Sequence, residues 1–247
     1  MNATVHEIAP DVFRISSYVP DFDMEFNHFL VRDEQPLLYH AGMRRMFPDL
    51  KEALATLIDP KSLRWIGYSH FEVDECGALN DWFAIAPHAQ AVAGQIGAIV
   101  NLADFSSRPA RGLDKGELLE TGKYRFRYHP TPHLPHGWDA GVLFEETHGT
   151  LFVSDLFHHN GKREPLTSDD VVERSRAAAK QMQSGPLMDY VPYTPKTERL
   201  LSELAGFAPK TMAIMHGSSF TGDGADALRR LGRAYAEIFG VTGTGDR

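Results

Sequence analysis

The sequence predicts a layered domain of the α/β or α+β class. Strand-like and helix-like patterns succeed one another along the chain, and hydrophobic residues (43%) and charged residues (23%) stand at ordinary globular levels. The 247 residues leave little room for a second full domain, because single α/β domains reach about 250 residues. We therefore expect one domain over residues 1–247.

Two hairpins open the chain. Residues 5–8 and 12–16 are separated by a proline-containing turn, and residues 26–32 and 36–40 by Asp33-Glu34. Strand and helix then alternate: the apolar spacing predicts helices over residues 49–57, 77–83 and 95–105, and short strands over residues 63–68 and 89–93.

Further strand pairs and three helices complete the pattern. We expect one strand pair within residues 118–129 and another formed by residues 142–146 and 150–154. The later spacing predicts helices over residues 168–183, 197–207 and 225–239, a strand over residues 211–215 and a frayed tail over residues 242–247. Ser168 is expected to cap the first of these helices, with Asp169 and Asp170 at the positive end of the helix dipole.

Composition excludes several classes of protein. The chain carries 25 basic and 33 acidic side chains, a net charge of −8, without the basic clusters that phosphate binding requires, so we expect no nucleic-acid partner. No apolar stretch approaches the ~18 residues of a membrane span, and the first residues lack the features of a signal peptide, which favours a cytoplasmic protein without membrane contact. Cys76 is the only cysteine, which excludes disulfide frameworks and multi-cysteine metal sites.

The first cluster of candidate metal ligands follows the strand expected at residues 63–68. His70, Glu72, Asp74 and Glu75 stand within six consecutive positions, in a chain with 12 histidines. Alternating side chains at a strand end can converge on one side, and imidazole and carboxylate are common metal ligands. Taken alone, the segment also fits a solvated acidic loop.

More candidate ligands stand at the ends of later elements. A proline-stiffened loop presents His133 and His136, one apolar strand ends on Asp155, and another ends on His216. A buried carboxylate such as Asp155 is costly unless it is paired or bound to a metal. Each position has an ordinary alternative: His136 as a loop histidine, Asp155 as a helix cap, and His216 as a core histidine.

Together, this order of candidate ligands resembles the metallo-β-lactamase fold, in which a ligand cluster after one strand is followed by a histidine, an aspartate and a His-Gly pair, each at a strand end. The resemblance extends from about residue 5 to residue 239. Residues 117–122 and 124–131 are similar to that superfamily's strand pair before its third ligand. Residues 36–42 are similar to an early strand, with His40 in place of an aspartate. The resemblance implies a four-layer αββα sandwich.

Within the superfamily, the chain is similar to the diiron domain of flavodiiron proteins and to related oxygen-binding diiron proteins. Hydrolases usually carry H-x-H-x-D-H, whereas residues 70–75 have H-F-E-V-D-E, similar to the H-x-E-x-D-H motif of the diiron domains. The H-G-W-D segment at residues 136–139 is similar to that family's H-W-P-D element. The gaps of 61 (136 − 75), 19 (155 − 136) and 61 (216 − 155) residues also resemble its spacing.

The resemblance implies a pair of metal ions held by six side chains: His70, Glu72 and His136 on one ion, Asp74 and His216 on the other, and Asp155 bridging the two. Glu75 is a seventh candidate, because it stands where the family has a histidine. Three roles stay open for it: a carboxylate ligand, a partner of a ligating water, or a side chain that points away. His133 is expected behind the ligands or facing the substrate, and His158 and His159 are expected at the surface.

Iron is the metal we expect. Carboxylate-rich sites without thiolates suit iron or manganese better than zinc, and zinc and manganese remain the alternatives. If Glu75 ligates, four carboxylates (−4) and two divalent ions (+4) make a neutral site. Flavodiiron proteins receive electrons through the FMN of a flavodoxin-like domain. The sequence shows neither that domain nor the cysteines of a rubredoxin, so the resemblance implies no intrinsic FMN and an external flavoprotein or rubredoxin as electron donor.

Three functional hypotheses follow from the resemblance. The leading one is a stand-alone non-haem diiron protein that binds or reduces O2 or NO. The second is a binuclear hydrolase in which a hydroxide shared by two ions attacks a carbonyl or phosphoryl group. The third is an oxygen or redox sensor that signals to a partner. Family members are often dimers, so a homodimer is expected. Five aromatic side chains are candidates for either a pocket lining or the core: Phe22, Phe26, Phe71, Trp82 and Trp138.

Overall fold

The two expected N-terminal hairpins build one edge of a seven-stranded mixed sheet. In a computed structural model that describes residues 3–240, the strands of this first sheet follow the chain order: β1 (Thr4–Ala9), β2 (Val12–Val19), β3 (Met24–Val31), β4 (Leu37–Tyr39), β5 (Trp65–Gly67), β6 (Gln90–Gly94) and β7 (Arg111–Leu113). Strands β1 to β4 pair antiparallel, and β4 to β7 pair parallel. The parallel part arises because helical segments separate its strands along the chain.

The second sheet is also mixed and has seven strands. Its spatial order is β12 (Leu166–Thr167), β14 (Ser219–Thr221), β13 (Thr211–Ile214), β11 (Thr150–Ser154), β10 (Gly141–Glu145), β9 (Arg125–Pro130) and β8 (Leu118–Glu120). Strands β8 to β11 form an antiparallel meander, and β11 pairs parallel with β13. Because β11 and β13 run in the same direction, the loops that follow them leave the sheet at the same edge.

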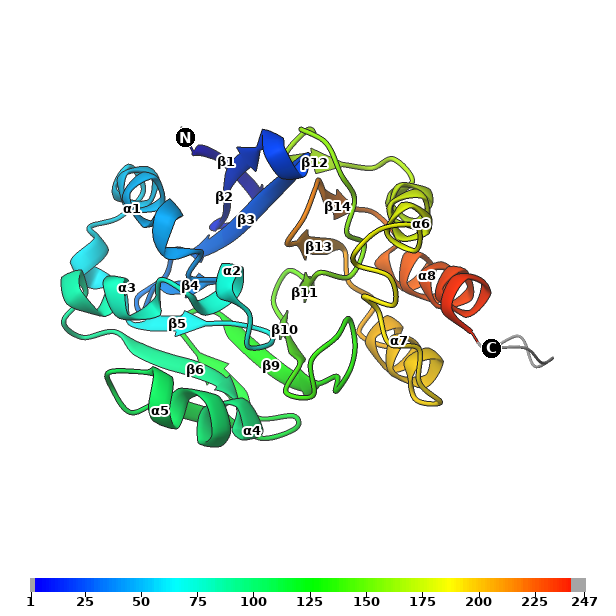
Figure 1. Cartoon of the computed structure of the whole chain (residues 1–247). Helices are drawn as coiled ribbons and strands as arrows, with labels where there is room; N and C mark the ends of the chain where they lie inside the picture. Colours follow the sequence, from blue (N-terminus) through cyan, green and yellow to red (C-terminus); the bar gives the residue numbers. More distant parts are fainter. Residues whose placement is uncertain (1–2, 241–247) are drawn as a thin grey trace.

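Helices cover both outer sides of the two sheets (Figure 1). On the first sheet lie α1 (Phe47–Ala55), α2 (Val73–Cys76), α3 (Leu79–Ile85), and a helical run made of α4 (Gln95–Gly97), a π-helical turn (Ala98–Leu102) and α5 (Ala103–Phe105). On the second lie α6 (Val171–Met182), α7 (Thr197–Ala205) and α8 (Gly224–Phe239). Short 3-10 turns occur at Pro20–Phe22, Arg44–Met46 and Pro60–Ser62.

Three apolar clusters fill the interfaces between the four layers. One packs the first sheet against α1 and α3 and contains Leu54 and Trp82. A second fills the space between the sheets, where Phe29 of β3 and Phe152 of β11 meet at 5.8 Å between ring centroids. A third packs the second sheet against α7 and α8. This is the αββα sandwich that the sequence predicted.

The expected strands and helices are present, with local corrections. Helix α6 starts at Val171 and not at Ser168, because the Asp170 carboxylate accepts hydrogen bonds from the N–H groups of Val172 and Glu173 and so caps the helix. The strands β7, β12 and β14 were not predicted. They have two or three residues each, too few for a periodic pattern, and are defined by their neighbours in the sheets.

The structure bears on the expectation of no membrane span, but not on the expected C-terminal tail. No helix within residues 3–240 combines the length and apolar character that crossing a membrane requires. The frayed tail expected at residues 242–247 lies outside the described part of the chain.

Candidate metal centre

Four of the predicted ligands converge from three separate loops. His70 follows β5, Glu72 precedes α2, His136 lies between β9 and β10, and Asp155 follows β11; each offers one donor atom within 4.8 Å of the others. Glu72 Oε2 lies 2.9 Å from Nε2 of both His70 and His136, and Asp155 Oδ2 lies 3.6 Å from the same two nitrogens. We call these four side chains the first donor group.

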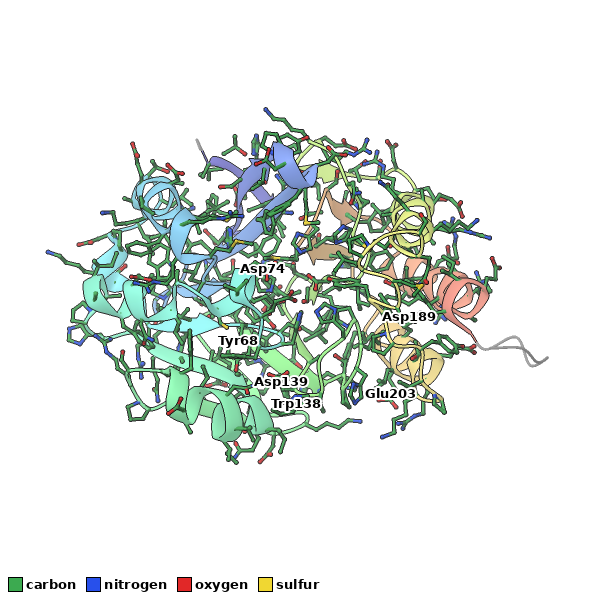
Figure 2. The ribbon with its side chains drawn as sticks, in the orientation of Figure 1. Tyr68, Asp74, Trp138, Asp139, Asp189 and Glu203 are labelled. Carbon is green, nitrogen blue, oxygen red and sulfur yellow. The ribbon has the colours of Figure 1, made fainter. Side chains whose placement is uncertain are left out.

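Asp155 also reaches a second set of side chains. Its other carboxylate oxygen, Oδ1, lies 3.2 Å from His216 Nε2, and that nitrogen lies 3.4 Å from Asp74 Oδ2. Asp74, His216 and Asp155 form the second donor group, in which Asp74 comes from α2 in the centre of the molecule (Figure 2). One carboxylate therefore joins the two groups, with one oxygen facing each.

The turn that carries His216 is fixed by hydrogen bonds from the first sheet. The ring Nδ1 of His216 lies 2.9 Å from the Glu25 carbonyl oxygen, to which it donates its proton, so Nε2 faces the carboxylates and would offer its lone pair to a metal ion. The carbonyl of Gly217 accepts hydrogen bonds from the buried side chains of Arg14 and Asn27. Gly217 has φ +102°, and an added Cβ would lie 2.4 Å from the His159 ring, so only glycine fits there.

Glu75 is directed toward the main chain that precedes His70. One of its oxygens accepts hydrogen bonds from the N–H groups of Ser69 (2.7 Å) and His70 (3.0 Å). The other accepts from the Ser154 hydroxyl and lies 3.4 Å from His70 Nδ1. Glu75 is 1% exposed, and these contacts favour the third role left open for it, a side chain that points away from the second metal position. A carboxylate behind a ligating imidazole fixes its ring and raises its basicity.

The imidazoles and carboxylates of the donor groups shift one another's pKa values. Hydrogen bonds from His136 and His70 lower the pKa of Glu72 to about 2. Burial alone would lower the pKa of His70, but the surrounding carboxylates outweigh it and raise the pKa to about 10. Burial would raise the pKa of Asp155, yet the close contact and charge of His216 hold it well below its usual value. Cations are therefore favoured here, and metal binding would displace these protons.

Tyr190 also contacts the donor groups, although nothing in the sequence analysis indicated it. Its hydroxyl donates a hydrogen bond of 2.8 Å to Asp155 Oδ2, and burial together with that carboxylate raises the pKa of Tyr190 well above its usual value. Tyr190 lies in an irregular segment between α6 and α7, 35 residues from Asp155 along the chain. No local motif marks such a residue.

His158 and His159 are buried, which corrects the expectation that they lie at the surface. Phe157 has φ +66°, a left-handed conformation that turns the chain back into the protein directly after Asp155. The Nε2 atom of His159 accepts a hydrogen bond of 2.9 Å from the Ser218 N–H and so supports the His216 turn. The His158 ring lies 4.8 Å from the His216 ring, centroid to centroid.

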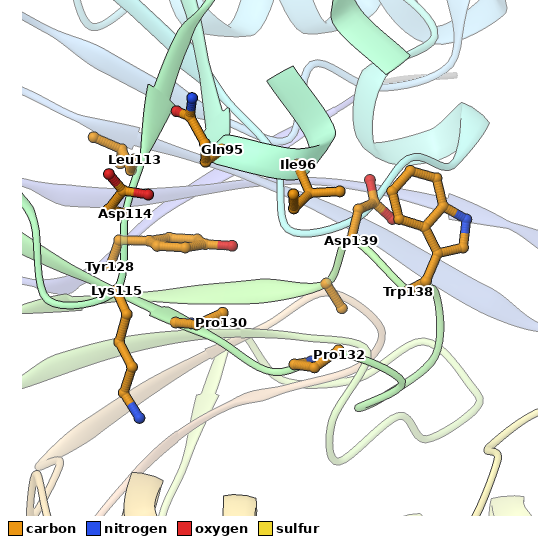
Figure 3. A pocket seen from close by; sticks show the side chains of 11 residues that line it. Gln95, Ile96, Leu113, Asp114, Lys115, Tyr128, Pro130, Pro132, Trp138 and Asp139 are labelled. Carbon is orange, nitrogen blue, oxygen red and sulfur yellow. The ribbon is translucent and has the colours of Figure 1, made fainter. Parts of the chain in front are cut away.

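His133 and the aromatic candidates take different positions. His133 is exposed, and its main-chain N–H donates to the Gly137 carbonyl within the loop that carries His136. Trp82 is a fully buried core residue, whereas Phe71 and Trp138 are about half exposed. Trp138 borders a cavity of about 330 Å³ behind the His136 loop, shown in Figure 3. The Asp139 carboxylate at this cavity accepts hydrogen bonds from the Phe71 N–H and the Asn101 side chain, which ties the His70 loop to the His136 loop.

A second cavity, of about 310 Å³, borders the donor groups. Its apolar walls come from Phe22, Met24, Phe26, Met43, Val73, Met182 and Leu187, and its polar wall from Glu72, Asp74, His158, Tyr190 and His216. No lysine or arginine of residues 3–240 lines it. We call it the access cavity; it suits a small uncharged molecule better than an anion.

The donor atoms fit a pair of metal ions. Asp74 Oδ1 and Asp155 Oδ1 are buried and make no hydrogen bond within the described residues. Unpartnered buried carboxylate oxygens are costly, and a cation held between them removes that cost. Imidazole and carboxylate donors without thiolates suit iron and manganese, and also bind zinc.

Comparisons with known proteins agree with this fold. Residues 24–217 match the family described as "ODP family beta lactamase". The rubredoxin-oxygen oxidoreductase of Megalodesulfovibrio gigas is 25% identical over 201 residues, covering 80% of this chain and 49% of that protein. Among solved structures, rubredoxin oxygen:oxidoreductase from Desulfovibrio gigas has a TM-score of 0.80 at 22% identity, covering 95% of this chain and 61% of that one. The flavodiiron protein from Giardia intestinalis has a TM-score of 0.79 at 16% identity, covering 95% and 60%.

Fold and site thus define a metallo-β-lactamase-like domain with a candidate site for metal ions. The chain belongs to the ODP family and is similar to the diiron domain of flavodiiron proteins. It spans about half the length of the rubredoxin-oxygen oxidoreductase. That protein's activity and partners therefore enter only as a proposal.

Proposed function

We propose that this protein is a diiron protein that binds or reduces O2 or NO with electrons from an external donor. The observation that carries the proposal is the shared carboxylate of Asp155. One of its oxygens faces the first donor group and the other faces the second. Such a carboxylate could hold two ions, and a pair of iron ions held there would supply redox chemistry toward a small molecule such as O2 or NO.

Each donor group has a defined part in this proposal. His70, Glu72 and His136 would hold one ion, Asp74 and His216 the other, and Asp155 both. Tyr190 donates its hydroxyl proton to Asp155, which fixes the orientation of the bridging carboxylate. The outer residues set the positions of the donor atoms, and iron held there would supply redox chemistry with electrons from the external donor.

The access cavity favours a diatomic gas over the substrate of a hydrolase. Its walls are mostly apolar, and apolar molecules such as O2 and NO enter such surroundings at little cost. No basic side chain within residues 3–240 lines the cavity, so only the metal ions could offset the charge of a phosphodiester or other anionic substrate. This observation supports the oxidoreductase over the hydrolase.

Electrons for a reduction would come from outside the described domain. Residues 3–240 are accounted for by the two sheets and their helices, and the similar protein of M. gigas is named for a rubredoxin donor. We therefore include a flavoprotein or a rubredoxin as the electron donor in the proposal.

Metal loading and O2 exposure test the proposal. Protein from iron-supplemented and zinc-supplemented growth is analysed for metal content, reduced without air and then exposed to O2. We expect two ions per chain in both preparations, with a change in the visible spectrum and O2 consumption only in the iron form. The zinc form is the matched control.

The outcomes separate the functional hypotheses. An iron-loaded protein that stays colourless and inert toward O2 contradicts the proposal. Turnover of esters, thioesters, lactones or phosphodiesters with zinc, manganese or iron would support the hydrolase. Reversible O2 binding without net consumption would support a sensor.

A further inference from the structure

The second donor group is poorer in donors than the first. It consists of Asp74, Asp155 and His216, with a single imidazole, whereas the first has two imidazoles and two carboxylates. Glu75 does not complete the second group, because its two oxygens are engaged by Ser69, His70 and Ser154. A further donor must come from elsewhere if the two positions are to bind metal comparably.

Two oxygens of the second group lack hydrogen-bond partners. Asp74 Oδ1 is buried and makes no hydrogen bond within the described residues. Asp155 Oδ1 has His216 Nε2 at 3.2 Å but no well-aligned hydrogen bond from it. Both carboxylates approach His216 Nε2, Asp74 through Oδ2 at 3.4 Å and Asp155 through Oδ1 at 3.2 Å, so a cation in the space beside that nitrogen would satisfy them.

His158 stands beside this space with a free ring nitrogen. It is 6% exposed and borders the access cavity together with Asp74 and His216. Its Nε2 lies 3.0 Å from the side-chain oxygen of Asn160, which can only accept a hydrogen bond. The proton is therefore on Nε2, and Nδ1 carries a lone pair that is buried without a partner. A hydrogen bond from one ring nitrogen that leaves the other free is the arrangement that prepares histidine for a metal.

The spacing of the rings supports the same role. His70 and His136, the two imidazoles of the first group, have ring centroids 4.2 Å apart. His158 and His216 have centroids 4.8 Å apart, at an interplanar angle of 52°. The second position therefore has a pair of imidazoles at nearly the same separation as the first.

We propose that His158 donates Nδ1 to the metal ion of the second donor group, beside Asp74, Asp155 and His216. The inference rests on the two-metal part of the proposed function and not on its O2 chemistry. It gives the second ion four protein donors.

Metal titration of a His158→Gln variant tests the proposal. Metal-free wild type and variant are titrated with Co²⁺ against a competing chelator without air, while bound cobalt and its visible bands are recorded. We expect wild type to bind two equivalents. In the variant, the first should bind as before, and the second at least about tenfold more weakly, with altered bands. His88→Gln, which removes an exposed histidine from another loop, is the matched control and should behave as wild type.

Two results would overturn the proposal. One is a His158→Gln protein that binds both equivalents within about twofold of wild type and with unchanged bands. The other is a wild-type protein that binds only one equivalent. Two ions bound in an iron-loaded protein that ignores O2 would refute the proposed function and leave this inference standing.

A second variant, His158→Cys, decides the matter if the glutamine protein does not fold. A thiolate at this position should ligate the second cobalt ion and add a sulfur-to-metal charge-transfer band that grows only with the second equivalent. A folded His158→Cys protein that binds two cobalt ions without that band contradicts the proposal.

Discussion

The two donor groups of the centre are built differently. The first draws His70, Glu72 and His136 from two tethered loops, and Glu75 lies directly behind His70. The second depends on Asp74 of α2, on the left-handed turn after Asp155 and on the turn at His216. The first group is therefore braced by a buried carboxylate, while the second is left with fewer donors.

Glu75 explains much of this asymmetry. In contact with Ser69, His70 and Ser154, it adds a negative charge behind the first group and offers no oxygen to the second. Glu75 thus orients a donor of the first group, His70, and adds no donor to the second group. The two positions should therefore respond differently to a change at residue 75, which mutation can test.

The largest effect is expected from Asp155→Asn, which removes the charge that both groups share. Because partners that merely orient a ligand are worth about 10- to 100-fold in metal affinity, loss of a shared ligand should cost at least about 100-fold for both ions. Calorimetric or chelator-competition titration with Fe²⁺ measures the two affinities. Asp169→Asn, at an exposed acid paired with Arg174, is the control and should leave both unchanged. Loss of only one ion would show that Asp155 does not bridge.

A smaller and one-sided effect is expected from Glu75→Gln. The amide keeps the shape but removes the charge that lies 3.4 Å from His70 Nδ1, so affinity at the first position should fall by about 10- to 100-fold. The second position should change by less than about threefold. The same titration of Glu75→Gln measures the two affinities. The optical spectrum of a Glu75→His variant, compared with that of wild type, provides a second check. A loss confined to the second ion would instead show that Glu75 is a ligand there.

The smallest effect is expected on the pH dependence of stability, from the buried histidine His28. Burial lowers the pKa of His28 to about 3, with a further contribution from His40, whereas the carboxylates around His70 raise its pKa to about 10. The unfolded chain binds a proton at His28 near pH 6.5 and the folded chain does not. Metal-free protein should therefore lose about 1.4 kcal/mol of unfolding free energy per pH unit from this residue as pH falls below 6.5.

His70 behaves in the opposite sense. Its raised pKa contributes stability that is complete below pH 6.5 and is lost as pH rises toward about 10, so it adds no slope in the acidic range. Denaturant unfolding of wild type and His28→Gln between pH 4.5 and 6.5 measures the slope. Equal slopes in the two proteins would contradict the assignment of His28 as a neutral buried histidine.

Much of the layered fold could be predicted because its signals are local. The hairpins at β1–β2 and β10–β11, and the amphipathic helices α7 and α8, each carry their own pattern of apolar spacing. Strands β7 and β12 could not be predicted, because two or three residues carry no period and the pairing partner defines the strand. The cap of α6 was misplaced by two residues because Ser168, Asp169 and Asp170 all suit that position.

For the site, the kinds of donor and the strand ends that carry them follow from the local sequence. His70, Glu72, His136 and Asp155 could be named because strand ends project successive side chains into loops, a property of each local segment. Only the tertiary structure decided that Glu75 turns toward the main chain, that Tyr190 reaches Asp155, and that His158 is buried. These outcomes depend on left-handed turns and on contacts between segments far apart in the chain, whose energies no single segment contains.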